Sequence, residues 1–200
     1  HTLMTPFFTP DKAELDGFGP PKVFLAGVGP LMTEVAGEVC DGFICHGFTT
    51  EKFLREVTIP ALERGREKAG KTMEGFEIVG PSFVVTGNTA DEMEQAAIGT
   101  RQQIAFYGST PAYRPVLDLH GWGGLQEQLN ALSKQGEWAR MGTLIDDEIL
   151  NTFAVVGAPE DLAPELSQRY GDVISRISFY APYSSDPDRW AAVMAALQAA

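Results

Sequence analysis

A strand that runs directly into a helix is visible in residues 20–30, which read Pro20-Pro-Lys-Val-Phe-Leu-Ala-Gly-Val-Gly-Pro30. The apolar run after the two prolines predicts a short buried strand at residues 22–26. Pro30 fits the first turn of a helix, because a residue there needs no N–H partner. We expect the apolar face of this helix to consist of Val35, Ala36 and Val39.

The same order of strand and helix recurs along the chain. Further buried strands are predicted at residues 43–45, 76–86 and 173–180, each followed by a helical pattern. We expect Gly80-Pro81 to break the strand at 76–86, and Pro60 to kink or restart the helix that Thr50 caps. Residues 108–150 show no obvious strand. Residues 153–156 fit a short strand or the end of a helix, and we favour the interpretation as a buried connection.

Four such units of strand and helix imply a parallel sheet covered by helices. They fit either a small doubly wound sheet or half of a (β/α)8 barrel, whose full form needs about 250 residues. The chain begins with His1 and not with Met, which favours the half barrel and a piece of a longer protein. No repeat or low-complexity linker is present, so we expect a single domain over residues 1–200 with no internal boundary.

The composition argues against several classes of partner. The 27 acidic and 15 basic residues give a formal charge of −12, which repels a phosphate backbone, so we expect no nucleic-acid partner and no membrane-surface role. No apolar run reaches the roughly 20 residues that span a bilayer, and no signal peptide is visible. Cys40 and Cys45 cannot form a disulfide framework, so we expect a reducing, cytoplasmic location.

Residues 65–72 match the phosphate-loop pattern G-x-x-x-x-G-K-[ST], but in the wrong setting. A true loop of this kind follows a strand and opens a helix. Here the residues end a helical pattern and precede a strand. We therefore interpret Gly70 as the C-cap of a helix.

The turn Gly27-Val28-Gly29-Pro30 is better placed, at the carboxyl end of the first strand and the start of a helix. Glycines there let the backbone approach a ligand, and free amides favour an anion. The turn is not a dinucleotide fingerprint, because Met32 occupies the third glycine position. A tight structural turn and a phosphate or cofactor contact both remain open.

Cys45-His46-Gly47 ends the second strand at the same edge, where a site role for His46 and a structural one are both open. Cys40 and Cys45 have no second pair of metal ligands nearby in the sequence, so we expect no metal site and take both as packing residues. His120 is interpreted as part of a surface turn. Phe48, Tyr107 and Trp122 are candidate pocket aromatics, and Asp146-Asp147-Glu148 a solvated helix start.

These residues also resemble a known family. The stretch quoted above, followed by Glu34-Val-Ala-Gly-Glu-Val-Cys-Asp-Gly-Phe-Ile-Cys-His46, is similar to the middle of bacterial luciferase-like oxidoreductases, and within them to the branch that uses the deazaflavin coenzyme F420. Residues 153–160 and 177–182 resemble the family's closing segments. The resemblance covers nearly the whole chain.

The resemblance implies a TIM-type (β/α)8 barrel in which this chain supplies strands five to eight. It implies a hydride transfer between coenzyme F420 and a small organic substrate. The loop Ala26, Gly27, Val28, Gly29 and Pro30 would contact the coenzyme's chain and phosphate, with Cys45 and His46 at the mouth of the next strand. The first half of the barrel would hold the ring and the catalytic residues, so the chain alone is expected to be inactive.

Two alternatives stay open. One is an FMN-dependent monooxygenase of the same fold. The other, of a different class, is a non-catalytic half barrel that self-associates or binds a partner. In each case the exposed strand edges of a half barrel predict a homodimer or a pairing with the missing N-terminal half.

Overall fold

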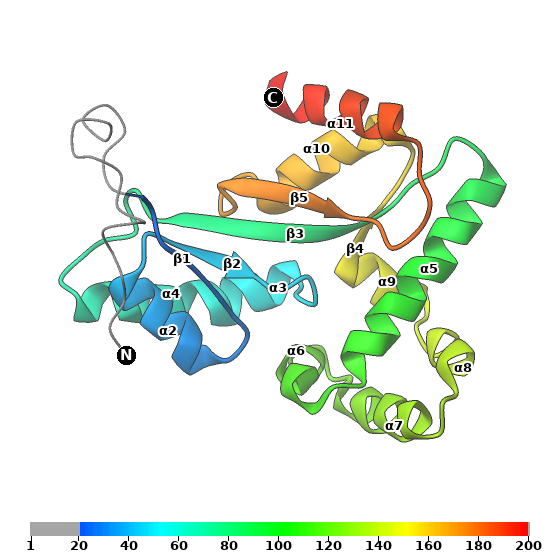
Figure 1. The fold of residues 1–200 in the computed structure, drawn as a ribbon, viewed down its shortest axis with the longest axis horizontal. Coiled ribbons are helices and arrows are strands. Elements are labelled where there is room, and N and C mark those ends of the chain that lie inside the picture. Colours follow the sequence, from blue (N-terminus) through cyan, green and yellow to red (C-terminus); the bar gives the residue numbers. More distant parts are fainter. Residues whose placement is uncertain (1–20, 200) are drawn as a thin grey trace, which may run out of the picture.

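Five parallel strands form one sheet in the computed structural model, which describes residues 21–199 (Figure 1). β1 (Phe24–Gly27), β2 (Gly42–Cys45) and β3 (Glu77–Val85) lie next to one another in that order. β3 also pairs with β4 (Ala154–Val156) near its end and with β5 (Arg176–Tyr180) along its other side. Because every pair is parallel, the carboxyl ends of the strands lie at one edge of the sheet.

The predicted break at Gly80-Pro81 is wrong, since β3 continues through both residues. On one side of β3, pairing with β2 stops at Val79 and pairing with β4 starts at Phe83, so the N–H that Pro81 lacks is not needed there. A Cβ on Gly80 would lie 2.4 Å from Ile174, so the glycine permits a close approach.

The interpretation of residues 153–156 as a connection is also wrong for most of its length. Ala154–Val156 is a strand, β4, whose partners are Phe83, Val84 and Val85. It lies beyond the end of β2 on the same side of β3. Its three residues are too few to show a strand period in the sequence.

Helices join the strands. In the first half of the described chain these are α2 (Pro30–Val39), α3 (Glu51–Phe53), the π-helical turn η2 (Leu54–Thr58), α4 (Ile59–Lys68) and α5 (Ala90–Gly108). A helical insertion, residues 111–153, then holds η3 (Pro111–Tyr113), α6 (Arg114–Leu119), α7 (Gly123–Lys134), α8 (Trp138–Gly142) and α9 (Asp147–Phe153). α10 (Pro159–Tyr170) and α11 (Pro187–Ala199) complete the described chain.

Local signals fixed several helix ends as predicted. The hydroxyl of Thr50 accepts the N–H of Phe53, and Asp146 accepts the N–H of Ile149 at the start of α9. Gly70 lies past the end of α4 with a φ of 66°, which confirms the C-cap interpretation of the phosphate-loop pattern. Pro60 lies in the first turn of α4, which begins at Ile59 directly after a π-helical turn, so the predicted restart of the helix is confirmed.

The predicted apolar face of α2 is wrong for two of its three residues. Val35 and Val39 are exposed, and the buried side of α2 consists of Thr33, Ala36 and Gly37. α2 packs closely against α4 there. A Cβ on Gly37 would lie 2.2 Å from the carbonyl oxygen of Leu62, so the contact selects small residues over valines.

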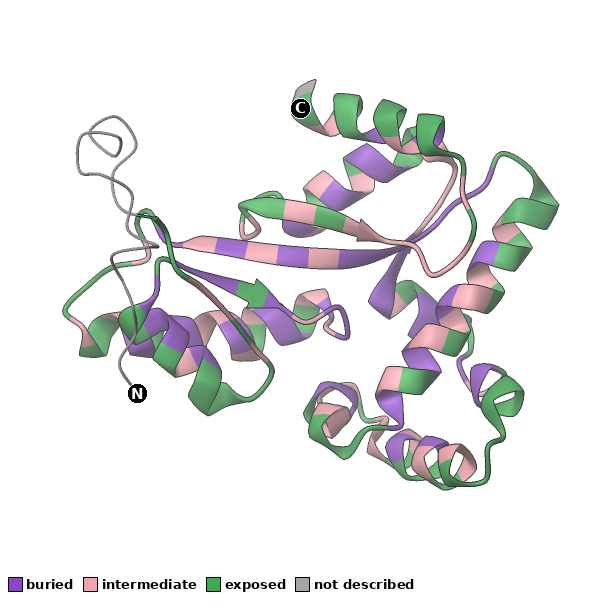
Figure 2. Cartoon of the chain, in the orientation of Figure 1, coloured by how far each residue is buried: buried purple, intermediate pink, exposed green. Residues whose placement is uncertain are grey.

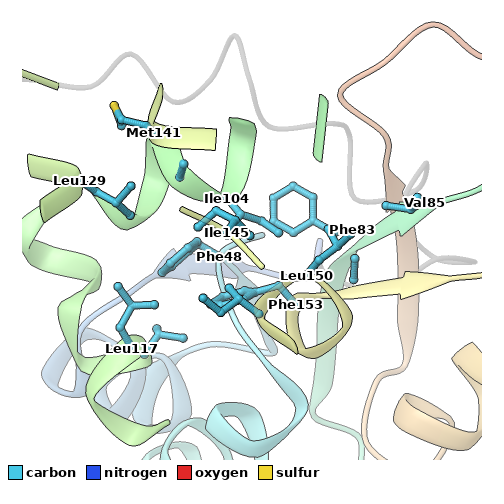
Figure 3. Close-up of a cluster of buried hydrophobic side chains, with 14 of the residues drawn as sticks. Phe48, Phe83, Val85, Ile104, Leu117, Leu129, Met141, Ile145, Leu150 and Phe153 are labelled. Carbon is cyan, nitrogen blue, oxygen red and sulfur yellow. The ribbon is translucent and has the colours of Figure 1, made fainter. Parts of the chain in front are cut away.

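A cluster of buried apolar side chains joins the helical insertion to the carboxyl edge of the sheet (Figure 3). Phe48, which follows β2, stacks on Phe153 at the end of α9 with ring centroids 4.5 Å apart. Phe83 of β3 and Ile104 of α5 lie in the same cluster. The insertion is therefore packed onto the edge where the strands end.

One face of the sheet is left uncovered toward its amino end in the described chain. Ala26, Ile44, Val79 and Arg176 are direct cross-strand neighbours and share this face. Ile44 is 38% exposed on it, whereas its neighbours Phe43 and Cys45 are buried under the helices on the other face (Figure 2).

At the amino end of this open face, Glu77 of β3 forms ion pairs with Lys22 and Arg176. The hydrogen bond from Lys22, followed by that from Arg176, lowers the pKa of Glu77. The guanidinium of Arg176 also lies 5.6 Å from the ring centroid of Phe24. These charged groups thus lie at the amino end of the open sheet face, away from the edge where the strands end.

The close contact between α2 and α4 predicts the effect of a small change. A Cβ on Gly65 would lie 1.9 Å from the carbonyl oxygen of Glu34, which is backbone and cannot move aside freely. Gly65→Ala should lower the free energy of unfolding by about 1–3 kcal/mol in urea titrations, although alanine favours helices.

The matched control is Gly124→Ala in α7, where a Cβ would meet nothing within 4 Å. That change should leave the stability equal or raise it. Equal effects of the two substitutions would contradict the packing described here.

Candidate functional site

The turn between β1 and α2 is exposed at the carboxyl edge of the sheet. Ala26, Gly29 and Pro30 are exposed, and Gly27 and Val28 line a small cavity of about 20 Å³ together with Cys45 and His46. That space is enough for a water molecule and no more. The structure therefore brings the glycine turn and the end of β2 together, as the sequence predicted for one edge.

The two glycines of the turn serve different purposes. A Cβ on Gly27 would lie 3.2 Å from the Cβ of Met32 and 3.3 Å from the ring of Phe43, so this position is tight. Gly29 has an ordinary φ of −85°, and a Cβ there would meet nothing within 4 Å. Gly29 is thus open to an approaching ligand without any backbone strain.

The N-terminus of α2 differs from those of α5 and α9, which carry polar caps. No side chain caps it, its first residue Pro30 has no N–H, and no acidic residue lies in its first turn. By contrast, Thr89 caps α5 and Asp146 caps α9, each with acidic residues in the first turn. The start of α2 is left as a site of partial positive charge that suits an anion.

His46 has a defined proton position. Its Nδ1 accepts the backbone N–H of Phe48 at 3.0 Å, so the neutral ring carries its proton on Nε2. Nε2 lies 3.2 Å from the hydroxyl oxygen of Tyr113 and donates to it. Burial lowers the pKa of His46, which keeps the ring neutral near pH 7.

Two tyrosines pack against His46, and a third is bonded to one of them. The ring of Tyr113 stacks on it with centroids 4.7 Å apart, and the ring of Tyr107 meets it edge-on at 4.8 Å. The hydroxyls of Tyr107 and Tyr180 are hydrogen-bonded at 2.9 Å. We call His46, Tyr107, Tyr113 and Tyr180 the His–Tyr cluster.

Cys45 points to the opposite side from His46, as alternate residues of a strand must. Its side chain is buried under the helices, and burial raises the pKa of its thiol to about 12. Cys40 is buried as well, and both thiols are free. The structure agrees with a packing role for Cys45, and it adds no polar group of Cys45 to the site.

His120 makes a second contact between the insertion and the loop after β2. Its Nε2 lies 2.9 Å from the hydroxyl of Thr50, and its ring stacks on Trp122 with centroids 4.7 Å apart. Burial, followed by the charge of Lys52, lowers its pKa, while Glu56 and Glu148 act in the opposite direction. His120 is thus more than the surface turn predicted from sequence.

Of the candidate pocket aromatics, Tyr107 alone lies in the His–Tyr cluster. Phe48 is buried beneath it, and Trp122 is stacked on His120. Sequence reasoning missed Tyr180 and Tyr113. Tyr180 ends β5, so the rule that singled out His46 would have found it, whereas Tyr113 lies in an irregular turn without any pattern.

No group of three or more His, Cys, Asp or Glu side chains in residues 21–199 is arranged to hold a metal ion. In the same described range, no helix has the length and apolar character needed to cross a bilayer.

Comparisons with known proteins identify the family. The family described as luciferase-like monooxygenase matches residues 1–176, and the chain belongs to this family of oxidoreductases. An uncharacterised protein of Mycobacterium tuberculosis is 48% identical over 177 residues, which cover 88% of this chain and 51% of that protein. The 5,10-methylenetetrahydromethanopterin reductase of Archaeoglobus fulgidus is 26% identical over 85% of this chain and 52% of its own.

Solved structures agree on the fold. The coenzyme F420-dependent tetrahydromethanopterin reductase of Methanopyrus kandleri superposes with a TM-score of 0.66 at 19% identity, over 86% of this chain and 48% of that one. An F420-dependent secondary alcohol dehydrogenase superposes with a TM-score of 0.57 at 17% identity, over 88% of this chain and 47% of that one. The EDTA monooxygenase of Chelativorans sp. BNC1 superposes with a TM-score of 0.52 at 16% identity, over 91% of this chain and 45% of that one. The chain spans about half the length of the relatives it matches.

The two described histidines predict a pH dependence of stability. Each has a lowered pKa in the folded state, so the folded chain binds fewer protons than the unfolded chain, in which histidine titrates near about 6.5. The free energy of unfolding that these histidines contribute should be full above that value and should be lost as the pH falls below it, toward about 5.5. Urea midpoints across this range measure the effect, and His120→Asn should flatten part of the slope. Titration of both rings above 6.5 in NMR spectra would contradict it.

Proposed function

We propose that this chain forms strands five to eight of a luciferase-like barrel, as β1, β2, β3 and β5, in an oxidoreductase that transfers a hydride between coenzyme F420 and a small organic substrate. The observation that carries the cofactor assignment is the exposed, uncapped start of α2 at the carboxyl edge of the sheet. The fold likeness to two F420-dependent enzymes supports the choice of coenzyme.

The residues of the turn fit the phosphate of such a coenzyme. Gly29 leaves space for the ligand, and the first-turn amides of α2 supply donors without a competing carboxylate. When bound, the coenzyme would accept or give up the hydride. The chain's own part is to hold the anionic end through Gly27–Pro30 and to place the His–Tyr cluster at the same edge.

The uncovered sheet face supports a proposal about the partner. Ala26, Ile44 and Val79 lie on that face without a covering layer in the described chain, and β1, β4 and β5 each pair with one strand only. We propose that the first half of a barrel covers it, and that in its absence a second copy of this chain does so. Burying apolar residues and pairing strand edges both favour such closure.

The test is a titration of the complete barrel that carries this chain with coenzyme F420 and, separately, with FMN. Binding of F420 with a stoichiometric spectral change supports the proposal. Tight binding of FMN without binding of F420 would mean that the coenzyme is FMN and not F420, in line with the likeness to EDTA monooxygenase. Binding of neither would favour a non-catalytic module.

Gly29→Asp separates cofactor binding from folding. Aspartate is a good N-cap, so stability should stay within about 0.5 kcal/mol of the parent. Its charge would meet the phosphate at the start of α2, so the affinity for F420 should fall at least about tenfold. The measurements are a urea midpoint and the coenzyme titration.

The matched control is Ala158→Asp, which places the same charge at the N-cap of α10, another helix with no capping side chain and Pro at its start. It should leave coenzyme affinity unchanged. An equal loss in both variants would point to net charge and not to the turn.

A further inference from the structure

We infer that the hydroxyl groups of the His–Tyr cluster bind the oxygen atom of an uncharged carbonyl or alcohol substrate. This inference deepens the proposed function and rests on it, because it names the substrate class for the same edge of the sheet.

The cluster is built from four segments that are distant in sequence. His46 follows β2, Tyr107 lies in α5, Tyr113 ends η3 and Tyr180 ends β5. All four side chains are half-buried, so each packs on its neighbours and still reaches solvent. Such convergence of polar groups at the carboxyl edge of parallel strands is typical of a ligand site.

The proton of the Tyr113 hydroxyl is free to bind a ligand. Because the N–H of Phe48 occupies Nδ1 of His46, the imidazole proton is on Nε2 and points to the Tyr113 oxygen. That oxygen is therefore an acceptor in this contact. Among the described residues, no acceptor for the Tyr113 proton lies within hydrogen-bond distance, and the hydroxyl can donate outward.

The hydrogen-bonded pair Tyr107–Tyr180 has a second hydroxyl proton that is available to a ligand. One hydroxyl donates to the other across 2.9 Å, and the receiving tyrosine keeps its own proton without a further partner in the described chain. The rings of Tyr107 and Tyr113 are 6.0 Å apart, so the tyrosine pair lies beside Tyr113. Two phenol hydroxyl donors beside aromatic rings suit an apolar ligand that carries one oxygen acceptor.

The cluster is electrically neutral, and this selects the ligand. Its four side chains include no Lys or Arg, and the pKa of His46 responds to burial alone. Burial also raises the pKa values of Tyr113 and, to about 12, of Tyr180, so both stay protonated as donors at pH 7. A carboxylate or phosphate would find no counter-charge here, whereas a carbonyl or hydroxyl oxygen needs none.

The first experiment uses the 200-residue chain without any ligand or variant. The side-chain nitrogen shifts of His46 in NMR spectra report which ring nitrogen carries the proton. We expect the Nε2-protonated neutral ring at pH 7.5. A proton on Nδ1 would make Nε2 the acceptor of the Tyr113 proton, and the inference would be overturned.

The second experiment titrates the same chain with acetophenone, a neutral planar ketone, and with benzoate, an anion of similar shape. Acetophenone should give saturable shifts at His46 and Tyr113, with benzoate at least about tenfold weaker by the cost of burying an unpaired charge. Shifts elsewhere only, or equal affinities, would contradict the inference. No coenzyme is present, so the outcome is independent of whether F420 binds.

Tyr113→Phe tests the donor itself. Loss of one hydrogen bond should weaken acetophenone binding by about three- to tenfold. The control is Tyr183→Phe, which removes a hydroxyl bonded to the carbonyl oxygen of Val84 and lying outside the cluster. If Tyr113→Phe lowered the urea midpoint of unfolding while acetophenone bound equally well, Tyr113 would have only a structural role, joining the helical insertion to the sheet.

Discussion

The parallel pairing of β3 is the constraint on which the rest of the molecule depends. This strand carries β2 and β4 on one side and β5 on the other, and all of them run the same way. Every strand therefore ends at one edge. The glycine turn, His46 and Tyr180 are far apart in sequence and share a neighbourhood only because of that pairing.

The helical insertion depends on the same edge. Phe48 and Phe153 join it to the loop after β2 through apolar contact, and His46–Tyr113 and Thr50–His120 join it through hydrogen bonds. Both histidines are neutral in these contacts. The site is thus assembled only when the insertion is docked, which links the stability of this interface to the geometry of the His–Tyr cluster.

Much of this arrangement could be predicted from residue patterns. The strands at 24–27 and 42–45, the caps Thr50 and Asp146 and the turn at 27–30 all have local causes, and local causes are visible in sequence. The apolar face of α2 was mispredicted, because its partner α4 selects small residues through a backbone contact that no periodicity records. β4 is three residues long and exists only through β3.

The candidate site was predictable to the extent that it follows strand ends. His46 and the glycine turn are found by their position after apolar runs. Tyr113 is different, because an irregular turn brings it to His46 and only the folded insertion defines that turn. The charge-free character of the cluster is likewise a property of the assembled chain.

We propose that ligands bind at the carboxyl edge of the sheet. The most direct measurement is a map of backbone amide shifts in NMR spectra of the chain as coenzyme F420 is added. We expect the largest changes at Val28, Gly29 and Leu31 and at His46, with none at Glu77 or Arg176 at the amino end. Changes centred on Glu77 and Arg176, with the turn unaffected, would contradict it.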